Sequence, residues 1–226
     1  MFWDRQAACI DVRNTPYEEK GVVANFRCEK PHRNTAFQWF RKDGVLAYLP
    51  LPAQQISIVW SAPDDLADQL VALSPEALAV RVAEATDARL GALETITPAA
   101  AFPLRLMRVE RVVQPRLALI GDAAHAIHPL SGHGINLGYQ DARVLAEQLA
   151  ALPAWRDPGE LAVLRPYARA RAEEAALLQY TTHGLNRLFK PADPLLSGLR
   201  NLGLNLTNRL PVLRNALVRY AIAGRF

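Results

Sequence analysis

Residues 116–142, RLALIGDAAHAIHPLSGHGINLGYQDA, constrain the fold more than any other stretch of the chain. Their apolar run ends at Gly121, and the acidic residue Asp122 follows at once. Three residues that favour turns come next: Pro129, Gly132 and Gly134. A short, fully apolar run is typical of a strand buried on both faces of a parallel sheet. The sequence therefore predicts a buried strand, a tight loop and then a helix over 134–152.

The preceding part of the chain has the pattern of an antiparallel sheet. Short runs rich in Val, Ile, Phe and Trp are separated by Pro, Gly and Asp clusters, as expected for strands joined by turns. These runs cover 21–29, 35–43, 44–52, 54–62 and 102–113. Gly44 is expected to take a positive φ in a hairpin turn. Ser74, followed by Pro75 and Glu76, predicts the start of one helix over 74–84.

The predicted fold class is α/β of the α+β type, in three parts. They are an antiparallel sheet with one helix (1–113), a strand, loop and helix (114–155) and C-terminal helices (156–226). The last part contains one long helix over 159–189 and a segment from 194 to about 222 that Pro211 breaks. Because no other β-α-β unit is present, the strand ending at Gly121 lacks parallel neighbours. Its edges are then exposed, which favours self-association into a homo-oligomer.

Asp122 is placed where open α/β folds bind ligands, at the carboxyl edge of a strand. An ionised carboxylate only accepts hydrogen bonds, so it suits a ligand that carries hydroxyl groups, such as a sugar alcohol. The first amides of the helix that begins near Gly134 have no partner inside the helix and carry partial positive charge. They favour an electron-rich oxygen, and glycine allows a close approach.

Several features of this stretch have simple structural interpretations. Small residues recur four apart along the helix, at Gly134, Gly138, Ala142, Ala146 and Ala150, which favours close backbone packing. The three histidines, His125, His128 and His133, could suggest a metal site, but we predict none, and His125 is expected to orient the loop. Asp141 either hydrogen-bonds back to the loop or faces solvent. Arg105 and Arg108 are interpreted as surface cations of a strand.

The segment GDAAHAIHPLSGHGINLGYQDA resembles the second flavin motif of the FAD-dependent aromatic hydroxylases, the class A flavin monooxygenases typified by para-hydroxybenzoate hydroxylase. Within that family the chain is most similar to the ubiquinone-biosynthesis hydroxylases. AFQWFRKDGVLAYLPLP, ISIVWS and FPLRLMRVER resemble strands of that subgroup's substrate domain, and the sequence from Asn186 onward resembles its C-terminus.

The resemblance implies a cofactor, FAD, and a role for each residue of the motif. Asp122 would accept hydrogen bonds from the ribityl hydroxyls, and Pro129 would lie near the reactive face of the flavin ring. The amides of Ile135 and Asn136 would point at the pyrimidine oxygen. Three glycines would shape the same site: Gly121, Gly132 and Gly134. The family uses NAD(P)H as co-substrate and dioxygen, and no side chain of this chain is predicted to be catalytic.

The resemblance also implies that part of the family's fold is missing. The family holds the ADP half of FAD with a Gly-x-Gly-x-x-Gly turn, and Gly21 is the only glycine before Gly44. We therefore expect a truncated form of a monooxygenase that hydroxylates the aromatic ring of a ubiquinone precursor, binding FAD weakly by itself. The alternative is a non-catalytic binding or scaffold subunit of a quinone-biosynthesis assembly, in contact with other ubiquinone-biosynthesis proteins.

Charge is concentrated near the C-terminus. The net charge is +4, and residues 187–226 hold seven basic side chains against one acidic side chain. Nucleic acid is not an expected partner, because no aromatic or glycine-rich motif accompanies this charge. Leucines recur there with arginines between them, so the segment either covers a protein surface or lies on an anionic membrane. A polyprenylated phenol substrate would reside in such a membrane. Because the sequence has no export signal and no apolar span, the expected location is cytoplasmic. The alternative hypothesis is peripheral contact with the inner membrane.

Overall fold

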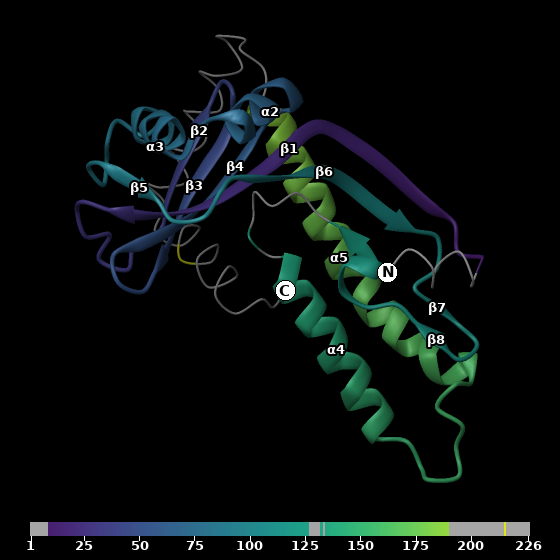
Figure 1. The fold of residues 1–226 in the computed structure, drawn as a ribbon. Helices are drawn as coiled ribbons and strands as arrows, with labels where there is room; N and C mark the ends of the chain where they lie inside the picture. The colour runs from purple at the N-terminus through teal and green to yellow at the C-terminus, as the bar shows by residue number, and fades with distance from the viewer. Residues whose placement is uncertain (1–8, 127–131, 133, 190–214, 216–226) are drawn as a thin grey trace.

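The computed structural model describes residues 9–126, 132, 134–189 and 215. Figure 1 shows two regions, a strongly curved sheet with two short helices and a pair of long helices. Strands β1 and β6 extend from the sheet toward the long helices and connect the two regions. The sequence-based prediction of an α+β chain is confirmed.

The main sheet has seven strands in the order β2-β3-β4-β1-β6-β9, with β5 paired to β1, and every pair is antiparallel. The strands are β1 (Val12–Cys28), β2 (Phe37–Arg41), β3 (Gly44–Leu51), β4 (Gln55–Pro63), β5 (Leu93–Thr95), β6 (Ala100–Val109) and β9 (His125–Ala126). Gly44 has a φ of +125° directly after the β2–β3 turn, as predicted.

One face of this sheet forms the main core under two helices, α2 (Asp64–Ala72) and α3 (Pro75–Glu84). The Ser74 hydroxyl accepts a hydrogen bond from the Ala77 amide at 3.2 Å, so the predicted N-cap of α3 is confirmed. Helix α2 is an addition to the single helix expected here. Fully or almost fully buried side chains fill this core: Val22, Phe26, Leu46, Tyr48, Ile56, Ile58, Trp60, Leu70, Leu78 and Val82.

The opposite face of the sheet carries apolar side chains that α2 and α3 do not cover. Successive residues of a strand point to opposite faces, so Val23, Val59 and Ala47 share this second face. They are aligned in register across β1, β4 and β3, and each is half-buried. Phe102 of β6, paired with Gly21, is 58% exposed. The sheet therefore has one apolar face that forms the core and another that is partly open.

The predicted buried parallel strand at 116–121 is wrong. Only β8 (Leu117–Ala118) is a strand there, and it pairs antiparallel with β7 (Val113–Gln114) in a separate two-stranded sheet. The predicted strand over 102–113 is divided accordingly into β6 and β7. A parallel strand needs parallel neighbours to satisfy its backbone, and the described part of the chain supplies none.

Two long helices follow, α4 (Gly134–Ala150) and α5 (Leu161–Phe189), and they run side by side (Figure 1). Both agree with the predicted helices over 134–152 and 159–189 within two residues. The further helical segment expected from 194 to about 222 lies outside the described residues, apart from Asn215. Among the helices that are described, none is long and apolar enough to cross a membrane.

Candidate functional site

The candidate site is built on the turn that follows β8. Gly121 has a φ of +56° and opens a one-turn 3-10 helix, η1 (Gly121–Ala123). A β-carbon at Gly138 of α4 would lie 3.2 Å from the Gly121 Cα, a closer contact than most side chains tolerate. Glycine at both positions therefore lets the turn and the helix meet backbone to backbone, which supports the packing interpretation of the small residues on α4 at Gly138.

Asp141, three residues after Gly138 on α4, holds the Gly121–Ala123 turn in place. Its side chain is fully buried, and Oδ2 accepts a hydrogen bond from the Gly121 amide at 2.8 Å. Of the two interpretations left open by the sequence, the bond back to the loop is therefore confirmed. Nε2 of His125, a residue only 6% exposed, lies 2.8 Å from the same oxygen. His125 thus has the orienting position expected for it.

Arg171 of α5 completes the contacts of Asp141. Its Nε donates to Asp141 Oδ1 at 2.7 Å, and Nη1 pairs with Glu174. Burial alone would raise the pKa of Asp141. The contacts with His125 and Arg171 outweigh that effect, and the pKa of Asp141 lies below its ordinary value. The carboxylate is therefore ionised near neutral pH, and it joins the turn, β9, α4 and α5.

The predicted cofactor-binding residues lie around this anchored turn. Asp122 is exposed, and its carboxylate has no hydrogen bond or ion pair with another described residue. Gly134 begins α4, and Ile135 and Asn136 in its first turn are exposed. Because Gly138 touches Gly121, the structure brings the first turns of α4 and the Gly121–Asp122 turn into one neighbourhood.

The loop between them is only partly described. Gly132 has a φ of +63°, and Pro129 lies outside the described residues. Within the described structure, no atom lies within 4 Å of the position that a β-carbon would occupy at Gly132 or Gly134. Among the described residues the start of α4 is therefore uncrowded at Gly134, and Ile135, Asn136 and the Asp122 carboxylate are exposed. This combination fits a flat ligand that has both hydroxyl groups and electron-rich oxygens.

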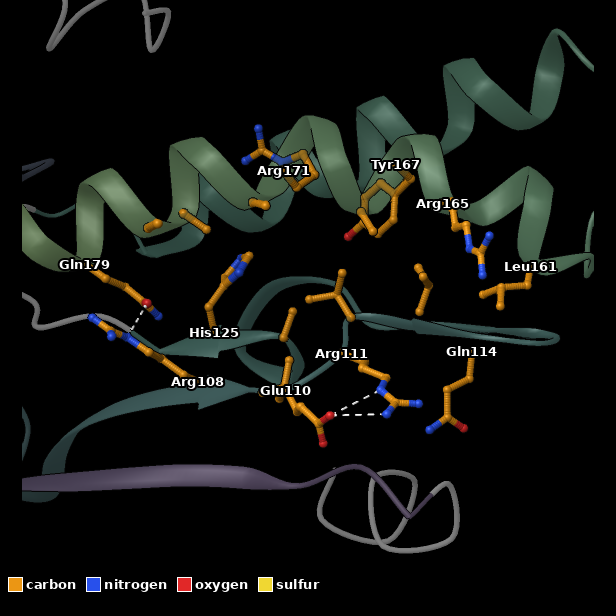
Figure 2. A pocket seen from close by; sticks show the side chains of 18 of the residues that line it. Arg108, Glu110, Arg111, Gln114, His125, Leu161, Arg165, Tyr167, Arg171 and Gln179 are labelled. Atoms are coloured by element: carbon orange, nitrogen blue, oxygen red, sulfur yellow. Dashed lines mark hydrogen bonds and ion pairs between the residues drawn. The ribbon is translucent and has the colours of Figure 1, made fainter.

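A pocket of about 710 Å³ lies behind the turn, between α5 and the strands β6 and β7 (Figure 2). Its walls include Val112, Tyr167, Ala168 and Ala172, with His125 at the side of the turn. None of the predicted cofactor-binding residues that the structure describes lines it. His125 and Arg171 line the pocket and also contact Asp141.

Two polar contacts hold α5 to the strands. Arg108 Nε donates to Gln179 Oε1 at 2.9 Å, drawn as a dashed line in Figure 2, and Gln179 Nε2 donates to the Met107 carbonyl at 3.0 Å. The Arg108 guanidinium also lies 4.5 Å from the centre of the Tyr180 ring. The prediction that Arg108 is simply a surface cation is therefore wrong. The Tyr167 hydroxyl donates to the Leu119 carbonyl at 2.7 Å, just before the turn.

Sequence reasoning did not find Arg171, Gln179 or Tyr167. Helix α5 carries several basic residues, and Arg165 and Arg169 at neighbouring positions are exposed. The one available signal was the acidic residue Asp141 on a helix with small residues, which needs a cationic partner if it is buried. The sequence gives no means of choosing among the arginines of α5.

Comparison of the sequence with known protein families identifies the class of protein, which is a flavoprotein. The model of the FAD binding domain family matches residues 12–179. The chain belongs to this family.

Curated relatives agree with that class. The ubiquinone hydroxylase UbiL of Rhodospirillum rubrum is 34% identical over 219 residues, which are 96% of this chain and 51% of that protein. The 3-demethoxyubiquinol 3-hydroxylase of Escherichia coli is 33% identical, over 96% of this chain and 56% of its own length. The chain thus spans about half the length of the curated relatives it matches.

A solved structure also aligns with the chain. Pseudomonas aeruginosa PqsL, in complex with 2-aminobenzoylacetate, has a TM-score of 0.68 and 25% identity, and the match covers 84% of this chain and 53% of PqsL. The fold described above is therefore that of part of a flavin-dependent monooxygenase.

Proposed function

We propose that this chain forms part of an FAD-dependent monooxygenase that hydroxylates the aromatic ring of a ubiquinone precursor, with NAD(P)H as electron donor. The observation that carries the proposal is the anchored turn, in which Asp141 holds the Gly121 amide and Gly138 of α4 meets Gly121, while the adjacent Asp122 remains exposed. Family membership and the hydroxylases among the relatives support the reaction class.

In this proposal the turn binds the ribityl and ring half of FAD. The Asp122 carboxylate accepts hydrogen bonds from ribityl hydroxyls, which its lack of a described protein partner leaves it able to do. The amides of Ile135 and Asn136 stabilise negative charge at the pyrimidine end of the ring, because helix N-terminal amides favour anions without rearranging. Gly121, Gly132 and Gly134 leave room for the cofactor, and Pro129 borders its reactive face.

When bound, the flavin supplies the redox and oxygen chemistry. The residues of this chain bind and orient it and exclude water from it. The described residues offer no glycine-rich turn for the adenosine and pyrophosphate half, so that half needs other polypeptide.

The open face of the sheet supports the proposed substrate class. Val23, Ala47 and Val59 form an apolar strip across three strands, and Phe102 adds an exposed ring beside it. A polyprenylated phenol or quinone precursor has an aromatic head and an apolar tail, and an apolar wall with few polar groups is typical of sites for such ligands.

The proposed location is peripheral contact with the inner membrane. It is supported by the basic and leucine-rich sequence of residues 187–226, most of which lies outside the described structure. Liposome flotation of the chain with and without residues 194–226 tests it, and equal binding of both forms to anionic liposomes would remove the idea.

Flavin titration tests the proposed function. We define the complemented complex as this chain coexpressed with the part of R. rubrum UbiL that it does not match. The complemented complex is expected to bind FAD near one per chain and to consume NAD(P)H when given a short-chain polyprenylphenol, whereas the chain alone binds FAD weakly. A complemented complex that forms but takes up no flavin would contradict the proposal.

A further inference from the structure

Arg171 is a buried cation in the middle of α5, only 5% exposed, although Arg165 and Arg169 of the same helix are exposed. Its Nε bonds to Asp141 at 2.7 Å, its Nη1 pairs with Glu174, and its Nη2 has no hydrogen-bond partner among the described residues. In Figure 2, Arg165 and Tyr167 extend from α5 toward the strands, whereas the Arg171 guanidinium turns away from them. Arg171 lines the pocket, but the hydrogen bonds and ion pairs of its guanidinium are made to Asp141 and Glu174.

The Asp141 carboxylate connects Arg171 to the turn through its two oxygens. Oδ1 is held by Arg171, and Oδ2 receives the Gly121 amide at 2.8 Å. Gly121 is the residue directly before Asp122. His125 Nε2 also lies 2.8 Å from Oδ2. Because Arg171 holds the carboxylate at Oδ1, the carboxylate cannot rotate freely, and the position of the Gly121 amide depends on Arg171 together with His125.

A buried ion pair is a weak source of stability. Removing two charges from water costs as much as their attraction returns, and apolar residues of similar volume often stabilise a protein as well or better. Its geometric effect is strong by comparison, because charge-assisted hydrogen bonds are short and directional. In this chain the pair joins α5 to Asp141, the residue of α4 that holds the Gly121 amide of the turn.

We propose that Arg171 is a positioning residue for the cofactor site, which acts through Asp141 to fix the Gly121–Asp122 turn against the first turns of α4. The proposal rests on the proposed function for the identity of the cofactor. It assigns to α5 a role in placing the Asp122 carboxylate, although none of the predicted cofactor-binding residues lies on α5.

Amide hydrogen exchange in the chain without flavin tests the positioning directly. Arg171→Gln is expected to speed exchange of the Gly121 amide by about tenfold or more, as expected for losing a charged hydrogen bond, while the amides of Val22 and Phe26 in the sheet are unchanged. Arg171→Lys keeps the charge and is expected to restore part of the protection. Arg169→Gln, at an exposed position two residues away, is the matched control and should have no effect.

Unchanged exchange at Gly121 in Arg171→Gln would overturn the proposal. Equal acceleration throughout the sheet would overturn it as well, because it would show a general loss of stability. Should Arg171→Gln fail to fold, the comparison of Arg171→Lys with wild type decides by the same criterion.

FAD affinity of the complemented complex is the second readout, and it separates this proposal from the proposed function. Arg171→Gln is expected to weaken FAD binding about tenfold, and Arg169→Gln to leave it unchanged. If the wild-type complex binds no flavin, the proposed function is wrong, whereas the exchange of Gly121 still decides whether Arg171 positions the turn. If the complemented complex with Arg171→Gln binds FAD as tightly as the wild-type complex does, the role of Arg171 toward the cofactor is contradicted.

Discussion

The sheet and the pair of long helices are held together in different ways. The sheet has one continuous apolar core, in which Trp60, Phe26 and the side chains of α2 and α3 pack together. Around the turn and the long helices the described apolar clusters are small, one with Ile10, Leu119 and Ala124, the other with Val113, Leu164 and Tyr167. The same region holds the buried charged residues Asp141 and Arg171.

The two regions therefore contribute differently: the apolar core of the sheet stabilises the fold, and the buried charged contacts near the turn fix the positions of atoms around the candidate site. An apolar core stabilises a domain in rough proportion to the area it buries, but it constrains direction weakly. Charged hydrogen bonds add little net stability when buried, but they fix the positions of the atoms that they join. The region with less apolar packing and more buried charge is also the region with the candidate site.

The largest expected effect is in the sheet. Trp60→Ala removes a fully buried side chain from the main core and is expected to lower the free energy of unfolding by about 3–5 kcal/mol. Trp155→Ala, at a position 79% exposed, is the control, with an expected change below about 0.5 kcal/mol. Urea unfolding followed by circular dichroism measures both. Similar losses for the two variants would contradict the assignment of the core.

The next prediction concerns the buried charges. Asp141→Leu leaves Arg171 without its main partner and is expected to cost about 3 kcal/mol, because an uncompensated charge stays buried. The double variant Asp141→Leu/Arg171→Met should recover much of this loss. Arg143→Ala, which removes an exposed pair with Glu147 on the same helix, should cost about 0.5 kcal/mol or less. A double variant no more stable than Asp141→Leu would contradict the assignment of the loss to an uncompensated charge on Arg171.

A smaller effect is expected where the turn meets α4. Gly138→Val places side-chain atoms against the Gly121 backbone, since even a β-carbon would lie 3.2 Å from the Gly121 Cα, and is expected to cost about 1–3 kcal/mol. Gly134→Ala faces open space within the described structure and should change stability by about 0.5 kcal/mol or less. Thermal unfolding compares the two. Tolerance of valine at 138 would mean that the turn and the helix are not in contact.

The dependence of stability on alkaline pH tests the environment of the Tyr48 hydroxyl in the sheet core. Burial raises the pKa of Tyr48 to about 12, and its hydroxyl bonds to Thr86 Oγ1 at 2.8 Å. Because the folded pKa lies above the ordinary value of 10.0, stability from the neutral form is complete below pH 10 and is lost as the pH rises toward 12. Tyr48→Phe should cost about 1 kcal/mol at pH 7 and lose less stability between pH 10 and 12 than wild type, because only the contribution of Tyr48 is removed while the raised pKa values of Tyr17, Tyr167 and Cys28 remain. Equal slopes for both proteins between pH 10 and 12 would refute the assignment.

Local signals in the sequence predicted most of the secondary structure. The turn before Gly44, the cap at Ser74 and the helices over 134–152 and 159–189 depend on neighbouring residues, and all four agree with the structure. The strand at 116–121 was wrong because pairing depends on distant partners. The α2 helix was missed because it has no side-chain cap.

The site could be predicted only in part. Glycines, Asp122 and the start of α4 are visible in the sequence, because turn and helix-start chemistry is local. The anchor is formed by Asp141 and Arg171, 30 positions apart on two helices, and only the packing of α4 on α5 brings them together. The arginine that would position the turn therefore has no distinguishing mark in the sequence.

The most direct test of the account is the FAD affinity of the complemented complex with and without the Asp122 carboxylate. Asp122 is exposed and without a described partner, so Asp122→Ala should leave unfolding unchanged. Loss of a charged acceptor for the ribityl hydroxyls is expected to weaken FAD binding about 10- to 100-fold. Equal FAD affinity of wild type and Asp122→Ala would contradict the claim that this turn binds the cofactor.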